Sequence, residues 1–104
     1  KDLALGSQTV EWYDIPKSCL DNLGAIDLLL VDGPPQAKGK TMQARYPAIP
    51  LLYGRLSPQA VVFVDDANRE TESKMVERWK AEYPEWHSQG FDTVDGVCIL
   101  TRAL

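Results

Sequence analysis

Three aspartates in this sequence stand where carboxylates could do chemistry. Asp32 directly follows the apolar run Ile26–Val31, and the pair Asp65 and Asp66 directly follows the apolar run 60–64. If the two runs form neighbouring parallel strands, all three carboxylates lie at the carboxyl edge of one sheet, where open α/β sheets bind ligands. Carboxylates gathered there repel one another unless a cation or a ligand's donor groups offset the charge, and an all-oxygen site suits Mg²⁺. The simpler alternative is that an aspartate after a strand caps the next helix.

The first of the elements that would position these aspartates is a strand over Ile26–Val31. This run is apolar almost throughout, which is typical of a strand buried on both faces, and Gly33-Pro34-Pro35 ends it. A helix is predicted over residues 49–56 because apolar residues recur there at spacings of three and four, and Ser57-Pro58 would end it.

The second half of the chain repeats this order. A second buried strand is predicted over 60–64, and then a helix that Asn68 could cap and that Pro84 terminates. The chain closes with a predicted hairpin over 86–101, whose turn is Asp95-Gly96, a strong type I′ signal. The alternation predicts a single α/β domain over residues 1–104, with the two apolar strands parallel and helices covering the sheet.

Composition limits the classes of function. Eleven Lys and Arg against fifteen Asp and Glu give a net charge of −4, which disfavours binding to duplex DNA or to an anionic membrane. No apolar run is long enough to span a bilayer. The chain has only two cysteines, Cys19 and Cys98, whereas small secreted scaffolds usually carry more, so we expect a reducing, cytoplasmic setting.

A basic segment follows Asp32. Lys38, Lys40 and Arg45 form a short patch there, with Tyr46 beside it. The patch could be a solvated loop, or it could contact an anionic substrate. We assign Arg45 and Tyr46 as candidate substrate-binding residues, with Tyr46 near enough to the loop to be a pocket wall.

The same segment partly resembles a phosphate-binding loop, because Gly33–Thr41 ends in Gly-Lys-Thr after a strand. However, five residues separate its glycines where the motif requires four, and two prolines remove backbone N–H groups that would hold phosphate. A nucleotide-binding protein with a loop of this kind is therefore the weakest of the alternatives.

Four stretches of the sequence together resemble a known superfamily. They are Ile26–Pro35, Arg45–Ala48, Val61–Asp66 and the closing hairpin. They look like the C-terminal half of the class I S-adenosylmethionine-dependent methyltransferases, and among these like the small bacterial enzymes with Val-Asp-Gly-Pro after the fourth strand. The resemblance implies a partial Rossmann-like sheet with flanking helices. Its strand order would be 4-5-7-6, with the last strand antiparallel and inserted between its neighbours.

The resemblance also implies roles for the aspartates. The catechol-type O-methyltransferases, which are more distantly similar, hold Mg²⁺ with an aspartate after strand four and an Asp-Asn pair after strand five. Asp32 matches the first of these ligands and Asp65 the second, whereas Asp66 stands where that group has asparagine. In an intact enzyme Asp32 would be the catalytic residue, orienting a small-molecule methyl acceptor or the cation.

The cofactor-binding half of that fold has no counterpart before Ile26. The superfamily binds S-adenosylmethionine through a glycine-rich loop after strand one and an acidic residue after strand two, and the sequence before Ile26 contains neither. We therefore expect a fragment or truncated relative that is inactive alone. One edge of Ile26–Val31 would then be unpaired, and an open apolar edge favours pairing with a second copy, as a homodimer, or with missing polypeptide. The alternative function is a non-catalytic α/β association module.

Overall fold

The computed structural model describes residues 2–5, 8–33 and 44–102. Its elements follow the predicted alternation of strands and helices. In chain order they are β1 (Asp2–Leu5), β2 (Gln8–Glu11), α1 (Lys17–Asp21), β3 (Ile26–Val31), α2 (Ala48–Leu52), the 3-10 helix η1 (Tyr53–Arg55), β4 (Leu56–Asp65), α3 (Glu70–Glu82), β5 (Trp86–Phe91) and β6 (Val97–Arg102). β1 and β2 form a separate two-stranded antiparallel sheet.

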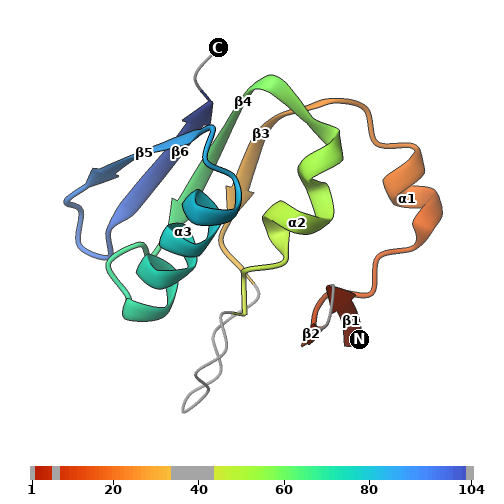
Figure 1. The fold of residues 1–104 in the computed structure, drawn as a ribbon, viewed down its shortest axis with the longest axis horizontal. Coiled ribbons are helices and arrows are strands. Elements are labelled where there is room, and N and C mark those ends of the chain that lie inside the picture. Colours follow the sequence, from red (N-terminus) through yellow and green to blue (C-terminus); the bar gives the residue numbers. More distant parts are fainter. Residues whose placement is uncertain (1, 6–7, 34–43, 103–104) are drawn as a thin grey trace.

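The other four strands form one mixed sheet in the order β3-β4-β6-β5. β3 and β4 run parallel, with Val31 opposite Val64, and β6 runs antiparallel to both β4 and β5. Figure 1 shows β3 at one side of this sheet and β5 at the other. The expected α/β architecture is confirmed: two parallel strands and a closing hairpin share one sheet that helices flank.

The hydrophobic core lies between this sheet and two helices, α2 and α3, which lie in front of the strands in Figure 1. The core joins strand side chains of one sheet face to the apolar sides of the two helices. Its central members are Val31, Val62, Val64, Cys98 and Leu100 from the strands and Ala48, Ile49, Met75, Val76 and Trp79 from the helices. The helices therefore cover a single face of the sheet.

This one-sided cover corrects the prediction that the strand over Ile26–Val31 is buried on both faces. Val31 is 2% exposed, but Leu28 and Leu30 are 65% and 61% exposed. Successive side chains of a strand point to opposite faces, so Leu28 and Leu30 share the face that α2 and α3 leave uncovered. An unbroken apolar run did not distinguish a strand covered on both sides from one covered on one side.

The helix predicted over 49–56 is shorter than expected. α2 and η1 occupy its first part, and β4 begins at Leu56 rather than at Ala60. Ser57 and Pro58 therefore lie within a strand instead of ending a helix. A proline is tolerated there because β6 pairs with β4 only from Val61 onward, and the β3–β4 register is irregular over the same stretch.

The closing hairpin is confirmed, but its turn is not the predicted two-residue Asp95-Gly96 turn. The connection between β5 and β6 spans residues 92–96, and Gly96 adopts the positive φ of 78° that suits glycine. The backbone N–H groups of Ala67 and Asn68 donate to the carbonyl oxygens of Gly96 and Asp95, at 3.1 and 3.2 Å. Asn68 is not the cap of α3, whose N-cap residue is Arg69. These two hydrogen bonds thus hold the hairpin loop against the segment that follows β4.

Three smaller expectations can also be compared with the fold. α3 ends at Glu82, two residues before Pro84, as predicted. Both cysteines are free, with Cys19 exposed and Cys98 buried. Within the described part of the chain, none of the helices has the length and apolar character needed to cross a bilayer.

Candidate functional site

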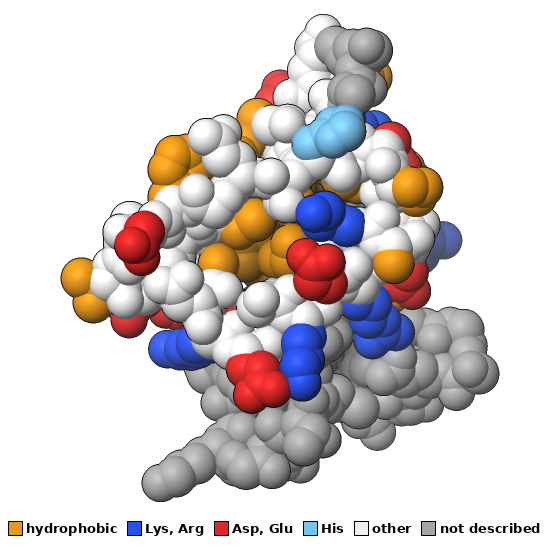
Figure 2. Space-filling view, turned by 60° about the vertical axis from the view of Figure 1, so that its left-hand side comes forward, with side chains coloured by type: hydrophobic (Ala, Val, Ile, Leu, Met, Phe, Trp, Pro, Cys, Tyr) orange, Lys and Arg blue, Asp and Glu red, His pale blue; other side chains and the backbone are white. Residues whose placement is uncertain are grey.

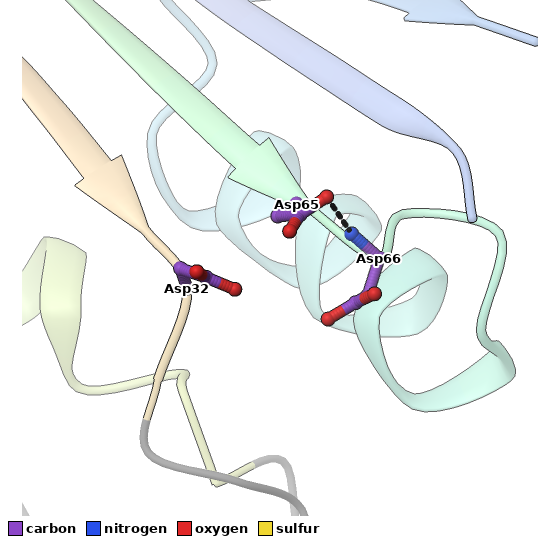
Figure 3. A group of neighbouring side chains, drawn as sticks. All are labelled: Asp32, Asp65 and Asp66. Carbon is purple, nitrogen blue, oxygen red and sulfur yellow. Dashed lines mark hydrogen bonds between the residues drawn. The ribbon is translucent and has the colours of Figure 1, made fainter. Parts of the chain in front are cut away.

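The three aspartates meet at the carboxyl edge of the parallel strand pair, as predicted (Figure 3). Asp32 follows the last residue of β3, Asp65 is the last residue of β4, and Asp66 follows it. The register that sets Val31 opposite Val64 brings these ends level. One carboxylate oxygen from each aspartate lies within 4.8 Å of the others. Asp32 is exposed, Asp65 is intermediate and Asp66 is buried.

Asp66 occupies a tight turn with an uncommon backbone conformation. Its φ is 59°, in the left-handed region that aspartate tolerates better than most residues. Its backbone N–H donates to Asp65 Oδ1 at 2.9 Å, and its carbonyl oxygen accepts the N–H of Arg69 at 3.0 Å. The chain therefore turns sharply after β4 instead of continuing along the strand direction.

Two arginines offset the charge of Asp66. Arg45, which is 4% exposed, places Nη1 at 3.1 Å from Asp66 Oδ2 and 3.3 Å from the carbonyl oxygen of Asp65. Arg69 Nη2 lies 3.6 Å from Asp66 Oδ1, but the Arg69 side chain is 53% exposed. A buried carboxylate requires such partners, because removing a charge from water is costly. Both oxygens of Asp66 thus face guanidinium groups.

Asp32 and Asp65 differ from Asp66 in this respect. Among residues 2–5, 8–33 and 44–102, neither forms an ion pair, and the one hydrogen bond to Asp65 uses only Oδ1. Two carboxylates with free oxygens, open to water, match the way Mg²⁺ binds proteins, which is through one or two carboxylates plus waters and substrate. The donor set therefore fits a divalent cation at Asp32 and Asp65, while the neighbouring Asp66 carboxylate is already paired with Arg45.

Tyr46 packs against α3. Its hydroxyl donates to the Glu82 carboxylate, the Arg78 guanidinium lies 3.6 Å from the centre of its ring, and its carbonyl oxygen accepts the indole N–H of Trp79 at 3.0 Å. Burial, followed by the hydrogen bond to Glu82, raises the pKa of Tyr46 to about 12. These contacts fix the backbone on which Arg45 stands. Substrate contacts by Arg45 and Tyr46 stay predictions.

Two contributors to the site were missed by the sequence interpretation. Arg69 stands three residues after Asp66, a spacing at which opposite charges meet in a turn or helix, and this signal was available. The second is Gly33, directly after Asp32. A Cβ atom there would lie 2.6 Å from the Tyr13 hydroxyl oxygen, so the glycine permits the tyrosine's close approach. No sequence pattern indicates that contact.

The basic residues Lys38 and Lys40, and most of the loop Gly33–Thr41 that resembles a phosphate-binding motif, lie outside the described residues. The predictions attached to them stay untested.

A concave feature separate from the acidic edge lies between α3 and the β5–β6 hairpin. It is a cavity of about 340 Å³, within the range of small-molecule pockets, and Figure 2 shows hydrophobic side chains inside the hollow on this side of the molecule. Its lining comprises Ala67, Asn68, Ser73, Val76, Glu77, Ser88, Gly90, Phe91, Asp92, Val97 and Cys98. Cys98 shows no sign of activation, because burial raises the pKa of its thiol.

Comparison with known protein families gives no family model that matches this chain, and comparison with curated proteins gives no match. The acidic edge and the sheet that carries it are therefore the features of this chain that bear on its function.

Proposed function

We propose that this chain is the C-terminal half, or a truncated relative, of a class I S-adenosylmethionine-dependent methyltransferase. One observation carries the proposal: Asp32 and Asp65 end adjacent parallel strands in a sheet whose antiparallel β6 is inserted between β4 and β5. The order β3-β4-β6-β5 corresponds to the order 4-5-7-6 that the sequence resemblance implied.

In the intact parent, the work of these residues would be positioning. Methyl transfer requires a nucleophilic oxygen or nitrogen aligned with the methyl group, and holding that alignment supplies much of the rate. The exposed Asp32 carboxylate can accept a hydrogen bond from the acceptor's O–H or N–H group. Asp32 and Asp65 together would hold Mg²⁺, which when bound orients a hydroxyl and lowers its pKa. Arg45 would act indirectly, by offsetting the charge of the neighbouring Asp66 carboxylate.

The bare face of the sheet gives independent support for a missing part. Parallel strands normally have both faces covered, yet Leu28 and Leu30 stand exposed on the face opposite α2 and α3. Within the described residues, β3 also has a neighbour on one side only. Further polypeptide placed beside β3 and behind the sheet would complete the layers. S-adenosylmethionine would then bind in that added part, and we keep a cytoplasmic location as part of this proposal.

A cation titration tests the site. We expect Mg²⁺, added to the full chain and followed by backbone amide chemical shifts, to perturb the residues around Asp32 and Asp65. Asp32→Asn and Asp65→Asn should each weaken binding at least about tenfold, or about 1.4 kcal/mol. Asp92→Asn is the matched control, because Asp92 is an exposed acid in the hairpin loop. An equal loss in the control would show that Mg²⁺ is only a diffuse counterion.

The coding sequence tests the kinship. We expect the DNA upstream of the Lys1 codon to encode, in frame, a strand followed by a glycine-rich turn. S-adenosylmethionine should not bind the chain alone, but it should bind when that upstream half is co-expressed. An upstream region without such a turn, together with no binding by the longer product, would refute the methyltransferase proposal.

A non-catalytic association module is the second candidate. The observation that favours it is the same open β3 edge, which requires no cofactor. It differs from the first candidate in predicting a stable oligomer that is indifferent to S-adenosylmethionine and Mg²⁺.

A further inference from the structure

The outer edge of β3 carries backbone hydrogen-bonding groups that pair with no other strand among the described residues. In the four-stranded sheet β3 pairs with β4 alone, and no other strand of the described residues reaches its second edge. Protected edges usually carry lysine, proline or a bulge that prevents pairing. The six residues of β3 contain neither lysine nor proline, and Asp27 is their single charge. The β3–β4 register shifts between Ile26 and Leu28, but it is regular from Leu28 to Val31, so this part of the edge lacks the usual protection against pairing with another strand.

Side chains next to the edge add an apolar surface. Leu28 and Leu30 are 65% and 61% exposed, and their register partners Val61 and Phe63 continue the same face into the sheet. The opposite edge strand, β5, differs because its central residues are the polar His87, Ser88 and Gln89. Covering the β3 edge would therefore remove more apolar surface from water than covering the β5 edge.

We propose that β3 pairs antiparallel with β3 of a second copy, across a two-fold axis perpendicular to the sheet. Such an axis keeps the helices of both copies on one face and the exposed leucines of both on the other. Opposite residues must then share a face, and one such register is centred on Leu29. It sets Leu28 of each copy opposite Leu30 of the other, and Asp27 opposite Val31.

Charge selects this direction of pairing. With Leu29 on the axis, the two Asp27 residues lie four residues apart along the strands, or about 14 Å, which is beyond the screening length of about 8 Å at physiological salt. The two Asp32 residues lie farther apart still, so the acidic edges of the two copies point away from each other. A parallel pairing would set Asp27 beside its own copy and bring the acidic edges together.

Across the two-fold axis the outer β3 edge of each copy pairs with that of the other, so neither edge is left free for a third copy. The interface is therefore closed, and it yields a dimer rather than a fibre. In the proposed parent enzyme the missing half would occupy the same edge. A second copy and that missing half are therefore alternative occupants of one edge, and the dimer proposal rests on the features of β3 rather than on the kinship with methyltransferases.

Sedimentation of the full chain tests the dimer. We expect a concentration-dependent shift from 11.6 kDa to twice that mass. Leu30→Lys should raise the dimer dissociation constant by at least about tenfold. The matched control is Val94→Lys, the same type of change at a loop residue that is 98% exposed. Because Leu30 is largely exposed, the variant should keep the wild-type circular dichroism spectrum; if it does not, Leu28→Lys gives the same test from the other side of the predicted pair.

A mixing experiment tests the register. Leu30→Lys mixed with Leu28→Glu sets the new lysine opposite the new glutamate, so the heterodimer should form more tightly than either variant alone. Leu30→Lys mixed with Leu30→Glu sets the two new charges diagonally across the strands rather than directly opposite, so it should recover less than the first mixture. A wild-type chain that stays monomeric, oligomers larger than the dimer, an equal effect of Val94→Lys, or recovery in the second mixture only would each overturn the proposal.

Discussion

Replacing Arg45 by methionine is the most direct test of how the acidic edge is held together. The substitution keeps an unbranched apolar stem but removes the guanidinium that lies 3.1 Å from Asp66 Oδ2. The partners' side chains are only 4% and 11% exposed. Removing one member of a buried ion pair typically costs about 3–5 kcal/mol, because the remaining charge is left in a site that water does not reach.

The structure places the expected loss near the lower end of that range. Arg69 still lies 3.6 Å from Asp66 Oδ1, but its side chain is 53% exposed, and exposed pairs contribute about 1 kcal/mol or less. We therefore expect Arg45→Met to lower the free energy of unfolding by about 3 kcal/mol. Arg69→Met, the control, should cost less than about 1 kcal/mol. Urea unfolding followed by tryptophan fluorescence measures both values, with the slope m checked for constancy.

A double-mutant cycle isolates the contribution of Asp66. Arg45 also donates to the Asp65 carbonyl oxygen, so the single variant reports more than one contact. Asp66→Asn preserves shape, and asparagine tolerates the left-handed backbone at this position. In the Arg45→Met background it should cost less than in the wild type by about 2 kcal/mol. Additive effects, or an Arg45→Met loss no larger than that of Arg69→Met, would refute the role given to this buried pair.

Two further predictions concern the core and the helix contacts. Leu100→Ala should lower the free energy of unfolding by about 2–5 kcal/mol because Leu100 is 1% exposed, whereas Leu28→Ala should lower it by less than about 1 kcal/mol. Urea unfolding measures both values, at protein concentrations too low for association. The reverse ranking would mean that the β3 face is covered. Burial raises the pKa of Tyr46 to about 12, above the ordinary value of 10.0, so the stability contributed by its neutral form is fully present below pH 10 and is lost as the pH rises through 12. Between those values the wild type should lose about 3 kcal/mol more than Tyr46→Phe, and parallel pH curves of unfolding would contradict this sign and cause.

The acidic edge could be predicted from the sequence because its signals are local. Asp32 and the pair Asp65 and Asp66 each follow an apolar run, and the parallel pairing that sets Val31 opposite Val64 brings these positions level. The partners of these aspartates were not predictable in the same way. Arg45 was assigned to a substrate, but its contact with Asp66 joins residues 21 positions apart. That pairing depends on how the segment before α2 packs against α3.

The one-sided cover of the sheet could not be read from the sequence for a similar reason. The composition of β3 is that of a doubly buried strand, and what covers it is decided by elements elsewhere in the chain. The early start of β4 was missed because Pro58 is normally a stop signal, and it is tolerated only where the neighbouring strand does not pair. The hairpin turn was predicted wrongly because the backbone N–H groups of Ala67 and Asn68, which lie outside the hairpin, hydrogen-bond to its loop.

The open edge and the acidic edge share one element, since β3 carries both. β3 is held by β4 alone within the described residues, and Asp32 is the first residue beyond its last paired position, Val31. Pairing of the outer edge would restrict β3 on both sides and so hold Asp32 more firmly beside Asp65. If pairing raises the affinity for a cation, the cation must raise the affinity of pairing by the same factor. We therefore expect Mg²⁺ to lower the dimer dissociation constant of the wild type in sedimentation but not that of Asp32→Asn. A dimer constant unchanged by Mg²⁺ in the wild type, where Mg²⁺ binding is itself observed, would show that the two edges act independently.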